Sequence, residues 1–188
     1  SMLNSDDLFV YFAEPIKTQL LEKNLRKSEP RGGKMDYDVD GTIAGNWFVE
    51  NTNGYQGLPE YNQLIGYWKT HLAFVQDPID PDILVVSMGD FGGKTSQFAI
   101  KGNAPNFVDI TTQTGIVKYE LVKYTYLDNG KVWDEGHYAE LTLKPKDAIE
   151  GVAMVQMLDD RKIKFESFPA KTASQVNGFT TNAKVYVR

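Results

Sequence analysis

Short stretches of alternating apolar and polar residues, each closed by glycine, asparagine, aspartate or proline, run from about Gly41 to the end of the chain. A strand with one buried face produces this period of two, and the turn residues mark where each strand ends. The 188 residues are enough for one domain with a substantial core. The pattern therefore predicts an all-β, closed or nearly closed antiparallel barrel, an architecture that often holds a small ligand.

About eight or nine strands are expected, and turn signals at 128–130 and 159–161 support the count. The expected strands cover 41–50, 68–76, 83–89, 96–101, 116–126, 136–143, 152–158, 162–168 and 183–187. The stretch 152–158 is apolar on both faces, so another element has to cover its outer face. The N-terminal helices are the expected cover, with plugging of one barrel mouth as the alternative.

Residues 3–28 are expected to be helical, with Ser5 as the N-cap and Pro15 breaking the helix or starting a second one. Glycine and proline at 28–33 indicate a linker after the helices. The predicted organisation is a short helical segment with its linker over 1–33 and a barrel domain over 34–188.

The net charge of −5, from 20 basic and 25 acidic side chains, argues against nucleic acid as a partner. The absence of cysteine excludes disulfides, thiolate metal sites and cysteine nucleophiles. No stretch approaches the roughly 18 apolar residues of a membrane span. No motif indicates a cofactor.

Two acidic segments are candidate metal sites. Residues 36–41 match the opening of a calcium loop, but the twelfth position, which needs a bidentate glutamate, is Trp47. Asp77, Asp80 and Asp82 lie in a turn with two prolines. We interpret the first segment as an acidic strand face and the second as a capped turn, and expect no metal site.

The sequence Gly45-Asn46-Trp47 resembles the G-x-W signature of the lipocalins and the wider calycin group. The resemblance implies a lipocalin-like barrel in which the tryptophan lies on the first strand and closes one end. The hallmark arginine of a late lipocalin strand has no clear counterpart, because Arg188 is at the terminus and Arg161 is in a turn.

Residues 37–41, 45–48 and 102–105 together resemble uncharacterised exported bacterial domains, some of which accompany cell-wall metallopeptidases. This resemblance implies a location in the bacterial envelope, periplasmic or secreted rather than cytoplasmic. It implies no activity.

Aromatic side chains make up 12% of the chain, and they suit both barrel cores and ligand platforms. The leading hypothesis is a non-enzymatic barrel that binds a small apolar or amphipathic ligand. The candidate ligand-binding residues are Trp47, Trp68, Phe74, Tyr119 and Phe165.

Two other functions stay open. One is an accessory interaction module that presents Tyr55, Tyr61 and Tyr67 to an envelope protein or glycan. The other is an enzyme on a calycin-like barrel, which requires a histidine and a carboxylate in one cavity. Its candidate acids and bases are His71, His137, Glu50, Glu120 and Glu140.

Overall fold

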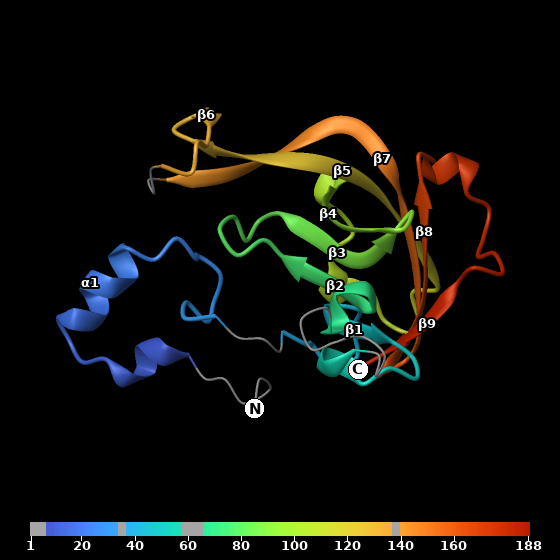
Figure 1. Cartoon of the computed structure of the whole chain (residues 1–188), viewed down its shortest axis with the longest axis horizontal. Helices are drawn as coiled ribbons and strands as arrows, with labels where there is room; N and C mark the ends of the chain where they lie inside the picture. The colour runs from blue at the N-terminus through green and yellow to red at the C-terminus, as the bar shows by residue number, and fades with distance from the viewer. Residues whose placement is uncertain (1–6, 34–36, 58–65, 137–139) are drawn as a thin grey trace.

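The computed structural model describes residues 7–33, 37–57, 66–136 and 140–188. Eight strands form a closed antiparallel barrel in the order β4-β3-β2-β1-β9-β8-β7-β5, with β4 paired to β5, and β6 is added beside β5 (Figure 1). The strands are β1 (Gly45–Val49), β2 (His71–Gln76), β3 (Leu84–Phe91), β4 (Lys94–Ile100), β5 (Ile116–Asp128), β6 (Lys131–Val132), β7 (Leu141–Asp159), β8 (Lys162–Pro169) and β9 (Lys184–Val187). The expected all-β, lipocalin-like barrel is confirmed.

Side chains fill the interior of the barrel. Alternation along β2 turns Leu72 and Phe74 inward, and both are fully buried. Phe74 makes ring contacts with Phe107 at 5.2 Å and with Phe165 at 6.1 Å between centroids. Residues from all eight barrel strands contribute to this one cluster, which makes the barrel a packed core.

Arg188 closes one end of the barrel, directly after β9. Its guanidinium carbon lies 4.1 Å from the centroid of the fully buried Trp47 ring. Its Nη atoms donate to the carbonyl oxygens of Ala44, Thr42 and Val39 at 2.9, 2.8 and 3.0 Å. Arg188 thus stacks on the tryptophan of the first strand.

The opposite end of the barrel carries a different contact. Lys184, the first residue of β9, donates to Asp90 Oδ2 near the end of β3 at 2.9 Å. Ser167 Oγ of β8 donates to the Asp90 carbonyl oxygen at 3.2 Å. The Asp90 and Lys184 side chains are nearly half exposed, so this bridge adds little stability by itself. It does bring the β3–β4 turn against β8 and β9.

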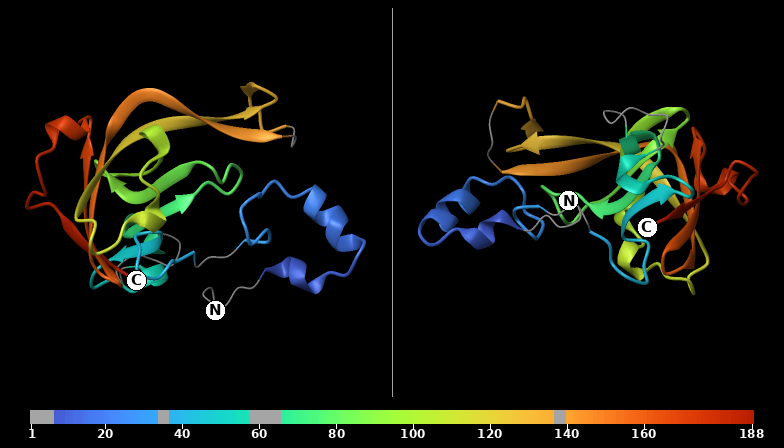
Figure 2. Two further views of the ribbon diagram at one scale, coloured as in Figure 1. Left: turned by 180° about the vertical axis from the view of Figure 1, so that it is seen from behind. Right: turned by 60° about the horizontal axis from the view of Figure 1, so that its bottom comes forward.

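The distal parts of β5 and β7 form an arm that projects from the barrel (Figure 2). The register between the two strands shifts on either side of Val122, and such bulges bend a strand. Residues 141–143 of the expected strand 136–143 and the whole expected strand 152–158 fall on the single long strand β7, whereas residues 137–139 lie outside the described residues. Beside the bulge, Val85, Ala99, Val122 and Leu143 form a small core of their own.

The acidic turn between β2 and β3 fastens the arm. Asp77 is fully buried, accepts from the backbone N–H groups of Ile79 and Asp80, and accepts from Tyr126 Oη at 2.6 Å. Asp80 Oδ2 accepts from the Leu143 N–H at 2.9 Å. The expected capped turn is confirmed, and its carboxylates also hold the arm. The described residues contain no group of three side chains able to bind a metal ion.

The outer face of the 152–158 stretch is covered from the C-terminal side. Val152 and Met154 pack with Phe168 and Val176, the last from the β8–β9 connection. The N-terminal helices do not cover it: within the described residues they reduce to a short 3-10 helix at Leu8–Tyr11 and α1 (Ile16–Glu22), which has no buried residue. Figure 1 shows α1 on the opposite side of the molecule from β8.

We expect Arg188→Ala to lower the free energy of unfolding by about 2–4 kcal/mol, because it removes a buried cation–π contact and leaves several carbonyl oxygens without their charged donor. Arg188→Lys keeps the charge without the planar fork and should recover less than half of the loss. Urea denaturation of the three proteins measures this. Equal midpoints for Arg188→Ala and the parent protein would show that this contact does not hold the barrel end together.

We expect Tyr126→Phe to cost about 1–3 kcal/mol, because the buried Asp77 carboxylate loses a hydrogen-bond donor. The loss should be local, so hydrogen exchange should accelerate in the outer parts of β5 and β7 more than in β2. Tyr11→Phe is the control, since Tyr11 is 75% exposed. Uniform exchange rates in Tyr126→Phe and the control would contradict a fastening role.

Candidate functional site

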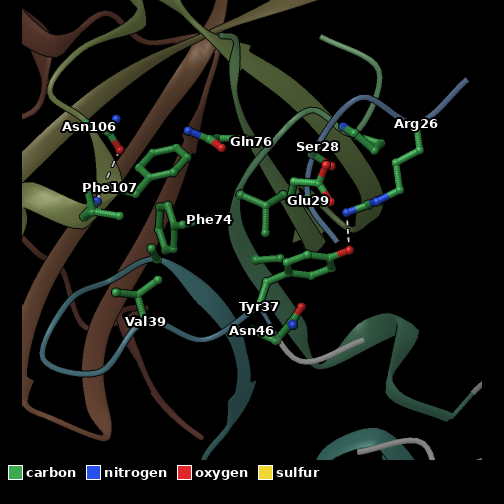
Figure 3. A pocket seen from close by; sticks show the side chains of 15 residues that line it. Arg26, Ser28, Glu29, Tyr37, Val39, Asn46, Phe74, Gln76, Asn106 and Phe107 are labelled. Atoms are coloured by element: carbon green, nitrogen blue, oxygen red, sulfur yellow. Dashed lines mark hydrogen bonds between the residues drawn. The ribbon is translucent and has the colours of Figure 1, made fainter. Parts of the chain in front are cut away.

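One hollow, of about 410 Å³, lies where one end of the barrel meets the N-terminal segment (Figure 3). We call it the end pocket. It is bounded by the end of β2, the start of β1, residues 26–29, residues 37–39 and residues 106–108. Its principal lining residues are Arg26, Ser28, Tyr37, Phe74, Gln76 and Phe107.

Phe74 and Phe107 form an apolar wall of the end pocket, with Val39 facing them (Figure 3). Phe107 belongs to a short 3-10 helix whose N-cap is Asn106, which accepts from the Val108 N–H at 3.3 Å. Both phenylalanines also belong to the packed interior. The wall is therefore rigid, which favours binding because little ordering is needed.

The wall from the N-terminal segment is polar. Arg26 donates through Nη2 to the Tyr37 hydroxyl, and through Nε to the Pro30 carbonyl oxygen at 3.0 Å. The Ser28 N–H donates to the Pro78 carbonyl oxygen at 3.1 Å, which docks this segment on the β2–β3 turn. A small molecule in the pocket would thus meet the exposed Val39 and Val108 on one side, with the buried phenyl rings behind them, and hydrogen-bonding groups on the other side (Figure 3).

Ser28 adds a specific polar atom. Its Oγ is buried and has no hydrogen-bond partner among the described residues, although Ser28 lines the pocket. A buried hydroxyl without a partner costs about 1–3 kcal/mol. A polar group of a ligand that reached this oxygen would recover part of that cost.

A second hollow, of about 440 Å³, lies on the outer face of β1 to β4. We call it the outer groove. The strand register places Asn46, Ala73, Ser87 and Gln97 side by side across the four strands. Ala73 has the smallest side chain of the four, so the row of side chains rises least from the sheet at that position. Trp68 lines the groove and is 56% exposed.

His71 lies in the outer groove with a fixed ring. Its Nδ1 is 2.9 Å from the Trp68 carbonyl oxygen, and its Nε2 is 3.1 Å from Ser87 Oγ. Burial lowers the pKa of His71 below its usual value, so the imidazole is neutral at pH 7. Because a carbonyl oxygen can only accept, Nδ1 carries the proton and Nε2 accepts from Ser87.

The five expected ligand residues separate into two places. Trp47, Phe74, Tyr119 and Phe165 are buried in the one interior core. Trp68 lies apart from them, because residues Gly66–Lys69 form a 3-10 helix instead of continuing the strand. Of these four candidates, Phe74 is the one that lines the end pocket.

The residues of the two other hypotheses are spread over the molecule. His137 and Tyr61 lie outside the described residues. Tyr55 and Tyr67 pack on Phe48 and on each other. Two of the candidate carboxylates have partners other than histidine: Glu50 pairs with Lys162, and Glu120 accepts from the Ala173 N–H. The third, Glu140, is exposed.

No helix in the part of the chain that the structure describes is both long and apolar enough to cross a membrane. In comparisons with known proteins, no family model matches the chain, and no match was found among curated proteins or solved structures. The end pocket and the outer groove are therefore the features from which a function is inferred.

Proposed function

We propose that this protein binds a small amphipathic molecule in the end pocket. The observation that carries the proposal is the composition of that pocket: the exposed Val39 and Val108 on one side, and Arg26, Ser28 and Gln76 on the other. Such a site places an apolar body against an apolar wall and orients it through a few polar groups. The volume of about 410 Å³ falls within the range of small-ligand sites.

The filled interior supports this location over the barrel lumen. Four of the five aromatic residues first considered for a lumen site, all except Trp68, pack against one another or against other core side chains. Opening a lumen of ligand size would require several of these rings to leave the core, and each large aromatic side chain that leaves its packing costs about 3–5 kcal/mol. The end pocket needs no such rearrangement. The location of the protein in a bacterial envelope stays a prediction.

Dodecylphosphocholine below its micelle concentration is a suitable probe, because it joins an apolar chain to a polar head. Val108 is 44% exposed and lines the pocket, so Val108→Trp should fill part of it. We expect calorimetric titration to show binding that Val108→Trp weakens at least about tenfold, or 1.4 kcal/mol.

Val132→Trp is the matched control, because Val132 is 71% exposed on β6 and does not line the end pocket. It should bind the probe like the parent protein, and both variants should keep the parent melting temperature. Absence of binding, or equal weakening by both tryptophans, would reject the proposed site.

A further inference from the structure

The outer groove has a feature that the end pocket lacks. None of the described residues that line it is Asp, Glu, Lys or Arg. Its polar groups are the amides of Asn46 and Gln97, the hydroxyls of Ser87 and Thr95, and the imidazole of His71. In a chain with 45 charged side chains (20 basic and 25 acidic), such a neutral set suits a ligand with many hydroxyl groups and no charge.

Trp68 supplies the complementary apolar surface. Trp68 is more than half exposed beside this polar row. Covering its flat aromatic face with a ligand would remove apolar surface from water, which favours binding. The ring of a pyranose sugar has one face of C–H groups, which packs on an indole, and a rim of hydroxyl groups, which bonds amides. Both surfaces are present in the outer groove.

The row of polar groups is held in a fixed register. Asn46, Ala73, Ser87 and Gln97 are direct neighbours on consecutive strands, so the row extends about 14 Å at the usual strand spacing. The Ser87 hydroxyl donates its proton to His71 Nε2. The lone pairs of the Ser87 oxygen are therefore left to accept from other donors. The methyl group of Ala73 leaves room between the longer side chains.

We propose that the outer groove binds a neutral sugar, stacked on Trp68 and hydrogen-bonded by Gln97, Ser87 and Asn46. The sugar has two sources. It is either a free oligosaccharide or the head group of an amphipathic glycoside. The second source follows from the geometry, because Asn46 and Ala73 line both the outer groove and the end pocket. That second source rests on the proposed function, whereas sugar binding itself does not.

Calorimetric titration with neutral oligosaccharides of glucose, mannose, galactose and xylose tests the sugar site. We expect at least one of these to bind, with affinity reduced at least tenfold by Trp68→Ala and several-fold by Gln97→Ala. Trp68→Phe should retain part of the affinity. Val132→Ala is the control, and circular dichroism melting verifies that each variant is folded.

Dodecyl maltoside below its micelle concentration, compared with maltose and with dodecylphosphocholine, distinguishes the sources. A glycoside that binds at least tenfold more tightly than maltose, and is weakened by both Trp68→Ala and Val108→Trp, identifies the amphipathic source. If Val108→Trp leaves sugar binding unchanged and the alkyl chain adds no affinity, the free oligosaccharide is the source.

Two results would overturn the sugar site. One is the absence of binding by every oligosaccharide and by the maltoside, whether or not dodecylphosphocholine binds. The other is sugar binding that Trp68→Ala leaves unchanged. Self-association that Trp68→Ala abolishes, without any sugar binding, would instead assign the groove to a second copy of the chain.

Discussion

The stacking of Arg188 on Trp47 is the contact on which the closed barrel depends most directly. The strands β1 and β9 are the first and last strands along the chain, and their register joins Phe48 with Val187 and Val49 with Tyr186. Arg188 extends this short seam by bonding the carbonyl oxygens that precede β1. Closure pairs the strands of the barrel on both sides, so that the barrel itself has no edge open to pairing with other chains.

Once the barrel is closed and filled, its outer surface becomes the place where binding sites can form. The bulge around Val122 directs the β5–β7 arm toward Val85 and Ala99, which it covers. The next outward residues on the same two strands, Ser87 and Gln97, lie beyond this cover and line the outer groove. One local irregularity thus decides which part of the β3–β4 face is buried and which part stays available.

The barrel could be predicted from the sequence because strands and turns leave local patterns. Alternation fixes which side chains of β2 turn inward. The turns at 128–130 and 159–161 need particular residues. The prediction failed where geometry is not local. A continuous strand over 68–76, as expected, would put Trp68 on the same face as Phe74, but the 3-10 helix at Gly66–Lys69 breaks the period. The polar wall of the end pocket comes from residues without periodicity, positioned by backbone bonds to Pro78.

The packed interior and the surface hollows are linked by the strand register. A slip of one residue in β2 would turn Phe74 outward and replace the small Ala73 with a ring or a leucine. The contacts of Phe74 with Phe107 and Phe165 oppose that slip. The side chains that leave no space inside the barrel therefore also preserve the space outside it, since they hold Ala73 between Asn46 and Ser87. The packed core and the low point of the groove at Ala73 are two consequences of one register.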